Sequence, residues 1–174
     1  MRNSKMKGFT LIELIVVIAI IGVLAAILVP SMIGYVGDSK LSTANSNAKL
    51  VFTNSATYST KCEVAGYPMD GDNSLTDVTS LTKTDDTPAT VSAPATADDI
   101  DLAEALRSLM GSESASAGVC KVTISAAGSP EDSVWAKTGS DLYIGGYPTA
   151  AVGKAENGLS NNGVPNTGST ETEK

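Results

Sequence analysis

An uninterrupted apolar run near the N-terminus places the strongest constraint on this chain. It extends from Leu14 to Val29 without a charged residue, and Arg2, Lys5 and Lys7 precede it. Together with the few residues just before it, the run would be about 30 Å long as a helix, which matches the hydrocarbon core of a bilayer. The basic flank is expected to stay on the cytoplasmic side. The chain therefore begins with a segment that is directed to a membrane.

Glu13 lies inside this segment and bears on how the segment is interpreted. A charged side chain at the centre of a membrane helix costs about 2.5–3.5 kcal/mol and is kept mainly where it serves a function. An ordinary secretory signal peptide, cut after the small-residue pattern Val23-Leu24-Ala25, has no use for this carboxylate. A plain signal anchor leaves it equally unexplained, and both interpretations stay as alternatives.

The residues around Glu13 carry a family resemblance. Lys7-Gly8-Phe9-Thr10-Leu11-Ile12-Glu13-Leu14, followed by the apolar run, resembles the prepilin signature of the type IV pilin and pseudopilin family. In this family a short basic leader ends in Gly, the next residue is Phe, and Glu is fifth in the mature chain. The resemblance implies that residues 1–8 are a leader, that a peptidase cuts after Gly8, and that the new amine of Phe9 is methylated. It also implies that Glu13 sets the register between subunits by pairing with a neighbour's amine.

After the apolar run the pattern becomes amphipathic, so one long helix is expected from about Thr10 to Tyr58. Residues 9–29 would serve the membrane and the filament core, and residues 30–60 would pack on a globular head. Pro30, Gly34 and Gly37 predict a kink or a flexible joint within this helix. The alternative is that the helix ends at Pro30. The apolar residues that recur at steps of three and four are Ile33, Val36, Leu41, Ala44, Ala48, Val51, Phe52 and Ala56.

The remaining chain predicts a small, loop-rich head over residues 61–152 and a disordered tail over residues 153–174. The stretch from Lys61 to Ala97 is polar and is interpreted as an exposed loop, with O-glycosylation left open. A short helix capped by Thr96 is expected from Ala97 to Met110, ended by Gly111. The three expected strands are Val119–Ala126, Ser133–Lys137 and Leu142–Gly145, which form an antiparallel meander.

Four side chains in the head attract specific interpretations. Cys62 and Cys120 are the only cysteines, and an extracellular domain with a small core gains from a cross-link, so a disulfide is preferred over two free thiols. Trp135 and Tyr143 are expected to pack against the long helix rather than to form a ligand platform. The acidic stretch from Asp70 to Asp77 is spaced loosely like a calcium loop, but it lacks the closing Glu of an EF-hand and is interpreted as a turn. No metal site is predicted.

Composition argues against several classes of function. The chain has no His, so the usual serine or cysteine triads and His-containing zinc sites are excluded. No G-x-S-x-G motif is present, and Gly153-Lys154 is followed by Ala155, so no phosphate-binding loop is indicated. With 12 basic against 19 acidic residues, and three of the basic ones in the leader, nucleic-acid binding is disfavoured. We predict no enzymatic activity and no cofactor.

These observations predict an α+β fold, in which a long N-terminal helix packs on a small antiparallel sheet, as in the pilin "lollipop". The resemblance implies a type IV pilus subunit, stored as a single-pass membrane protein and then polymerised with other copies into an extracellular filament on the cell surface. Implied partners are a prepilin peptidase/methyltransferase, an assembly platform protein and an assembly ATPase. The alternatives are a pseudopilin of a type II secretion or DNA-uptake filament and a membrane-anchored adhesin that never polymerises. A role in motility, adhesion or DNA uptake stays open.

Overall fold

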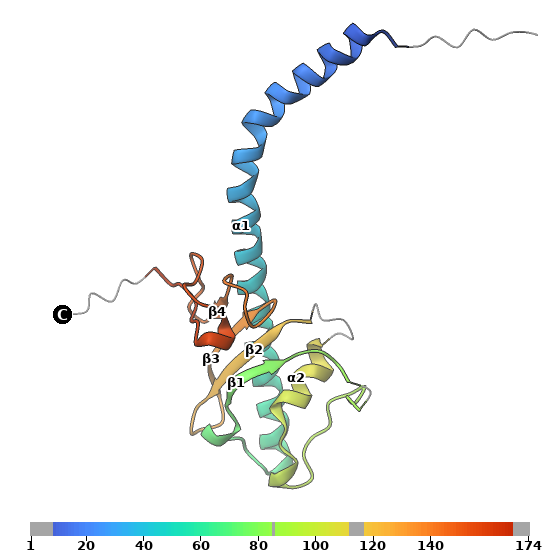
Figure 1. The fold of residues 1–174 in the computed structure, drawn as a ribbon. Coiled ribbons are helices and arrows are strands. Elements are labelled where there is room, and N and C mark those ends of the chain that lie inside the picture. The colour runs from blue at the N-terminus through green and yellow to red at the C-terminus, as the bar shows by residue number, and fades with distance from the viewer. Residues whose placement is uncertain (1–8, 85, 112–116, 169–174) are drawn as a thin grey trace, which may run out of the picture. The chain divides into compact units, whose positions relative to one another are not determined.

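The computed structural model describes residues 9–84, 86–111 and 117–168. The chain divides into two compact units, one up to Gly37 and one from Asp38 onward, and each is described by itself. The helices and strands, in chain order, are α1 (Leu11–Ala65), β1 (Leu75–Ser80), α2 (Leu102–Met110), β2 (Val119–Ile124), β3 (Pro130–Ala136) and β4 (Gly145–Tyr147) (Figure 1). A long N-terminal helix and an antiparallel sheet confirm the predicted α+β fold.

The first unit is the N-terminal part of α1. The helix passes through Pro30 without ending, so the alternative in which it stops at this proline is wrong. Directly after the proline, the Ser31 hydroxyl donates to the backbone carbonyl of Leu28 at 2.9 Å. Whether the helix kinks at Pro30 stays a prediction.

The second unit is organised by one buried stripe on α1. Its members recur at alternating steps of four and three residues, which is the spacing of one helix face. This stripe packs with Val122, Trp135 and Leu106 in a single hydrophobic core, so the sheet and α2 are both held against the long helix. The buried residues of α1 are Ala44, Ala48, Val51, Ser55, Tyr58 and Cys62.

The sheet is an antiparallel meander in the order β1-β2-β3-β4. Cys120 of β2 lies opposite Trp135 of β3, and Trp135 lies opposite Gly145 of β4. A Cβ atom on Gly145 would collide with the backbone of Ala44, so a glycine is required where β4 crosses α1. The predicted meander is confirmed, with one more strand than expected.

That additional strand, β1, corrects the prediction of an exposed loop from Lys61 to Ala97. β1 pairs antiparallel with β2 and is followed by Leu81, which is fully buried. As an edge strand it alternates poorly between buried and exposed residues, so the two-residue apolar period that signals a strand is missing from its sequence.

Several element boundaries also differ from the prediction. α1 continues past Tyr58 to Ala65 and stops at Gly66, whose φ of 87° suits a glycine. Hydrogen bonds from Gly66 to Glu63 and from Tyr67 to Cys62 form the Schellman motif that ends the helix. The expected helix from Ala97 to Met110 is split: Thr96 caps a short 3₁₀ turn, and α2 begins after Asp101, which accepts from the Glu104 N–H. β3 begins earlier than predicted, and β4 replaces the expected strand at 142–145.

The tail was predicted to be disordered, and for residues 153–168 this prediction is wrong. Leu159 is almost completely buried, and the Val152 N–H donates to the Asn166 carbonyl at 2.7 Å. One large apolar side chain and a few backbone hydrogen bonds hold a segment whose composition alone indicates disorder. Residues 169–174 lie outside the described part of the chain.

Asn45 joins α1 to the β4 region. Its side-chain oxygen accepts from the backbone N–H groups of Gly146 at 3.1 Å and Ala151 at 2.9 Å. Its side-chain nitrogen donates to the Ala151 carbonyl at 2.8 Å. In the same region, the buried Ser133 hydroxyl of β3 donates to the Ala48 carbonyl of α1 at 2.8 Å. These bonds fix how the sheet lies on the helix.

We expect Asn45→Ala to lower the free energy of unfolding by about 2–3 kcal/mol, because it leaves two N–H groups and a carbonyl of β4 and the following loop without partners. Denaturant unfolding of the full chain in detergent, followed by Trp135 fluorescence, measures this loss. Asn47→Ala is the matched control, since the described part of the chain shows no hydrogen bond from the half-buried Asn47 side chain. An equal loss in both variants would contradict the role assigned to Asn45.

Candidate functional site

The start of α1 is organised by a reciprocal pair of side chains. Phe9 is 92% exposed and precedes the helix. Thr10 is the N-cap, and its backbone N–H and its hydroxyl both donate to Oε2 of Glu13, at 2.8 and 2.7 Å. The Glu13 N–H in turn faces the Thr10 hydroxyl at 3.4 Å. This is a capping box, which satisfies N–H groups that no helical carbonyl can reach.

The sequence analysis does not predict the capping box, because it assigns Glu13 a partner in another subunit. The pattern Thr10-x-x-Glu13 before an apolar run is the local signal that predicts it. These hydrogen bonds satisfy one carboxylate oxygen but do not neutralise the charge, because Thr10 carries none. The charge of Glu13 therefore still has no cationic partner among the described residues.

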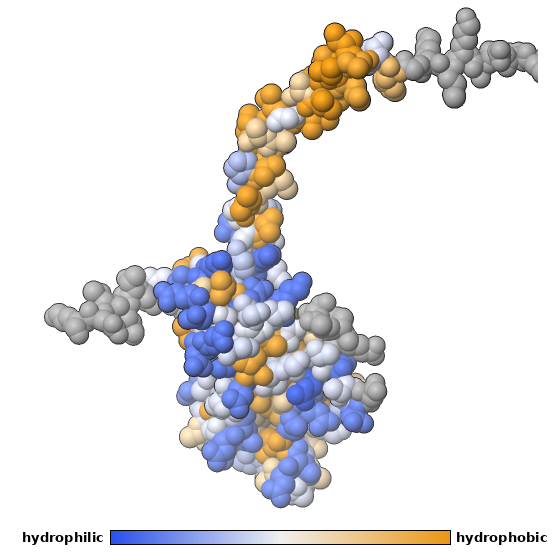
Figure 2. Space-filling model, in the orientation of Figure 1, coloured by the Kyte–Doolittle hydropathy of each residue, from blue (hydrophilic) through white to orange (hydrophobic). Residues whose placement is uncertain are grey.

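The apolar side chains of the first unit are exposed along its whole length. Figure 2 shows them as an almost continuous hydrophobic surface before the second unit begins. Each large side chain is about half exposed or more, and full burial of one such side chain is worth about 1.5–3 kcal/mol. α1 is the one helix in the described residues that is long and apolar enough to cross a membrane. The exposed residues are Phe9, Leu11, Ile12, Leu14, Ile15, Val16, Val17, Ile18, Ile20, Ile21, Val23, Leu24, Ile27, Leu28, Val29, Met32, Ile33, Tyr35 and Val36.

The structure brings most of the predicted N-terminal site residues onto one helix. Glu13, Pro30 and Gly34 all lie in the part of α1 that belongs to the first unit, and Phe9 lies two residues before the helix begins. A Cβ atom added to Gly34 would meet nothing within 4 Å, so nothing inside this chain requires a glycine there. Gly37 is the last residue of the unit, and Gly8 lies outside the described residues.

Cys62 and Cys120 share one core cluster and both are fully buried. They are free thiols in this structure, so the disulfide stays a prediction. Burial raises the pKa of Cys120 to about 12, against a smaller lowering by the Arg107 charge. Burial likewise raises the pKa of Cys62, against a smaller lowering by a hydrogen bond with Tyr58. As free thiols, both would be protonated and unreactive at neutral pH.

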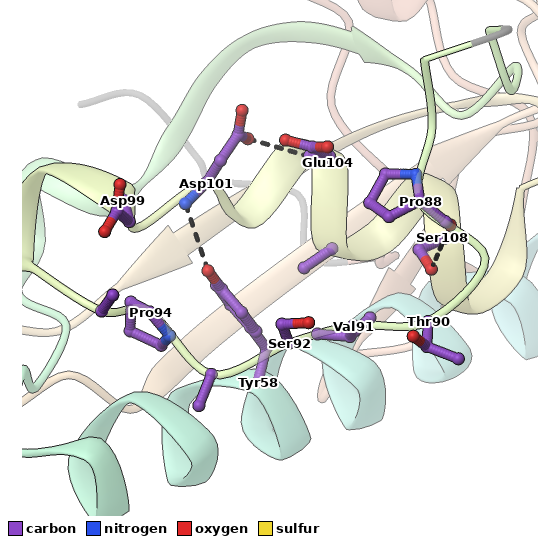
Figure 3. A pocket seen from close by; sticks show the side chains of 13 residues that line it. Tyr58, Pro88, Thr90, Val91, Ser92, Pro94, Asp99, Asp101, Glu104 and Ser108 are labelled. Carbon is purple, nitrogen blue, oxygen red and sulfur yellow. Dashed lines mark hydrogen bonds between the residues drawn. The ribbon is translucent and has the colours of Figure 1, made fainter.

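Several acidic side chains of the head accept hydrogen bonds from backbone N–H groups a few residues away. Asp70 and Asn73 form a capping box around a 3₁₀ turn, which agrees with interpreting this stretch as a turn. Asp99, Asp101 and Glu104 border a hollow of about 290 Å³, whose lining side chains are drawn in Figure 3. The Asp99 carboxylate accepts from the Thr96 N–H, and the Asp101 carboxylate accepts from the Glu104 N–H, both at 2.8 Å. Asp99 and Asp101 therefore have structural roles.

About a quarter of the chain is similar to known proteins. The prokaryotic N-terminal methylation motif matches residues 3–29. The type IV major pilin protein PilA of Myxococcus xanthus (strain DK1622) is 51% identical over 51 residues, which are 29% of this chain and 23% of PilA. The type IV major fimbrial protein FimA of Dichelobacter nodosus is 55% identical over 40 residues, which are 23% of this chain and 26% of FimA.

The type IV major pilin protein PilE1 of Neisseria gonorrhoeae is 50% identical over 42 residues, 24% of this chain and 26% of PilE1. The chain thus matches about a quarter of the length of these curated relatives. No solved structure matches the chain. The comparisons confirm the predicted resemblance to type IV pilins through the N-terminal segment, and most of the second unit lies outside the matched regions.

The predicted disulfide is best tested in denaturant. In the folded protein both cysteines are buried, so an alkylating reagent would fail to reach them whether they are bonded or free. We expect Cys62 and Cys120 of purified, air-oxidised protein to resist alkylation in denaturant until a reductant is added. Peptide mapping by mass spectrometry detects the cross-linked pair. Alkylation of both cysteines without reductant would contradict the disulfide.

The same pair predicts a pH dependence that differs between the two redox states. In the reduced protein each unfolded thiol ionises near its ordinary pKa of 9.0, whereas the folded Cys120 thiol stays protonated until about pH 12. The stability of the reduced form should therefore be complete below pH 9 and fall as the pH rises toward 12. The oxidised form has no thiol to ionise, so its unfolding free energy should lack this part of the decline.

Proposed function

We propose that this chain is the structural subunit of a type IV pilus, stored in the membrane as a prepilin and polymerised into an extracellular filament after its leader is removed. The observation that carries this proposal is the exposed apolar surface of the first unit, most of which lies within the match to a methylation motif. A helix with that surface cannot stay in water, since its large side chains lose the free energy of burial.

Two environments would cover this surface in turn. Before assembly, the hydrocarbon core of a bilayer matches residues 9–29 of this segment in length, and the basic leader stays on the cytoplasmic side. After assembly, the same segments of other copies would cover it in the filament core. A monomeric anchored adhesin uses only the first environment, and it would explain the capping role of Glu13 but not its charge. The names of the relatives, major pilins and fimbrial proteins, support a pilus over a pseudopilus.

The proposed cleavage between Gly8 and Phe9 falls before the first residue of α1, Leu11. Phe9 and Thr10 have no helical structure, because Thr10 caps the helix and the first helical residue is Leu11. Cleavage sites are favoured in exposed chain that lacks secondary structure. The peptidase would therefore need to unwind no helical turn, and the new amine of Phe9 would be free for methylation by the same proposed enzyme.

Glu13 keeps one oxygen for a partner from another subunit. Both hydrogen bonds from Thr10 reach Oε2, and within the described chain Oε1 accepts no hydrogen bond. In the proposed filament, the amine of a neighbour's Phe9 would bind this oxygen. A charge that loses its partner in an apolar bundle costs about 3–5 kcal/mol, so the pair would fix the axial register of the subunits. An assembly platform protein and an ATPase would drive the addition of each subunit.

We expect the surface form of the protein to lack residues 1–8 and to begin with N-methylated Phe9. Intact-mass measurement and N-terminal sequencing of sheared surface material check this. A protein that begins at Ala26 would instead restore the secretory signal peptide.

Three variants separate the charge of Glu13 from its capping role. Glu13→Gln keeps an oxygen that can accept from Thr10 but has no charge, Glu13→Ala removes both, and Thr10→Ala weakens the cap by about 0.5–2 kcal/mol while keeping the charge. We expect both Glu13 variants to lose surface filaments while the membrane pool remains, and Thr10→Ala to retain most filaments. Electron microscopy of sheared material, with immunoblots of the membrane fraction, measures both.

Abundant filaments of normal length from Glu13→Gln would show that the cap, and not the charge pair, supports assembly. Absence of filaments from the unaltered protein, with the chain retained in the membrane, would favour the anchored adhesin.

A further inference from the structure

Two Asn-Gly pairs lie near the end of the described chain. Asn157-Gly158 comes before a short 3₁₀ turn that begins at the buried Leu159, and Asn162-Gly163 comes after it. Both asparagines are exposed to solvent. An asparagine followed by glycine is prone to deamidation, because glycine has no side chain to keep the asparagine amide away from its backbone nitrogen. By sequence alone the two pairs have the same reactivity.

Deamidation of such a pair uses the backbone nitrogen of the glycine. This nitrogen attacks the Cγ atom of the asparagine, the Cγ–Nδ2 bond breaks, and the proton of the glycine N–H leaves with the amide nitrogen as ammonia. Water then opens the resulting succinimide ring at either carbonyl and gives aspartate or isoaspartate. The ring nitrogen carries no hydrogen, so a glycine N–H that donates a hydrogen bond has to lose that bond before the ring closes.

The fold holds Asn162-Gly163 away from this reaction. The Gly163 N–H donates to the Gly158 carbonyl at 3.0 Å, and ring closure would break this bond. Asn162 has φ 58° and ψ 26°, which is the left-handed conformation. At this ψ its Cβ atom lies nearly opposite the Gly163 nitrogen across the Cα–C bond. The Cγ atom of Asn162 therefore reaches that nitrogen only after the backbone rotates.

Asn157-Gly158 lacks these restraints. Within the described part of the chain the Gly158 N–H donates no hydrogen bond, although the residue is buried. Most buried backbone N–H groups are paired, so this donor is an exception. Asn157 lies in a bend outside any helix or strand, and its exposed side chain has no hydrogen bond to the described residues. Ring closure at this pair therefore breaks no hydrogen bond of the described chain.

We propose that Asn157 is a site of deamidation and that the fold protects Asn162 from the same reaction. The reaction needs only water and no enzyme. It proceeds faster at alkaline pH, because the glycine nitrogen attacks as its proton is removed. Since every residue involved belongs to the second unit, the inference does not depend on the proposed filament.

The isoaspartate product would loosen the chain around residue 157. On one side the Ala155 N–H donates to the Leu142 carbonyl at 2.8 Å, and on the other the Ser160 N–H donates to the Gly139 carbonyl at 2.7 Å. Isoaspartate places the former Cβ atom in the main chain, so the path between these two bonds becomes longer while their acceptors stay in place. We expect the hydrogen bond of Ser160 to open more often as a result.

The test compares the two asparagines in the full chain, folded in detergent and unfolded in denaturant, during incubation in mildly alkaline buffer. Peptide mapping by mass spectrometry follows each conversion, with fragmentation that distinguishes isoaspartate from aspartate. In the folded protein Asn157 should convert about tenfold faster than Asn162, which is the rate factor for about one retained hydrogen bond. In denaturant the two should convert at equal rates, because only the fold distinguishes them.

Two variants serve as matched controls. Asn157→Gln should remove the product at residue 157 and leave the rate at Asn162 unchanged, because the longer side chain closes its ring far more slowly. Asn157→Asp supplies the new charge without a longer main chain. Hydrogen exchange at the Ser160 N–H should therefore be faster in the isoaspartate form than in the unmodified protein, and unchanged in Asn157→Asp.

Equal conversion of Asn157 and Asn162 in the folded protein would overturn the inference. So would an Asn157 that stays intact in the folded protein for a time in which the denatured protein converts. If hydrogen exchange at Ser160 is the same in the isoaspartate form and the unmodified protein, the site stands and the proposed loosening is wrong.

Discussion

The apolar side chains of the first unit have no packing partner among the described residues, and the rest of the structure depends on this. A folded protein normally buries such residues in its own core, and here the core lies entirely in the second unit. The hydrophobic effect therefore obliges this segment to find cover from a bilayer or from other chains. The proposed storage in a membrane and the proposed growth into a filament would each bury this apolar surface.

The second unit solves a different problem, because its chain is poor in large apolar residues. α1 supplies a single stripe that serves as one wall of the core, and the sheet closes over it. Small residues allow the layers to approach closely: Ala44 and Gly145 meet where β4 crosses the helix. Asn45 and Ser133 then fix the contact with directed hydrogen bonds. A small core is thus supplemented by polar contacts that specify one arrangement.

What the sequence predicts well is what is encoded locally. The prepilin signature, the long helix and the strands β2 and β3 follow from spacing and from the period of apolar residues. The Thr10–Glu13 capping box and the stop at Gly66 are encoded by equally local patterns. β1 was missed because an edge strand needs no apolar alternation. The tail was mistaken for disorder because Leu159 is one residue among many polar ones. The bonds of Asn45 join residues about a hundred positions apart, and no local pattern encodes such a pairing.

The continuity of α1 has a mechanical consequence. A pull on the apolar segment is transmitted along one helix directly into the buried stripe from Ala44 to Cys62. Because the stripe runs along the helix, a pull along the axis of this part of α1 would load its contacts together in shear rather than one after another. Asn45 lies in the first buried turn of this stripe, and a bond between Cys62 and Cys120 would anchor its far end. A subunit built in this way resists tension with its core as a whole.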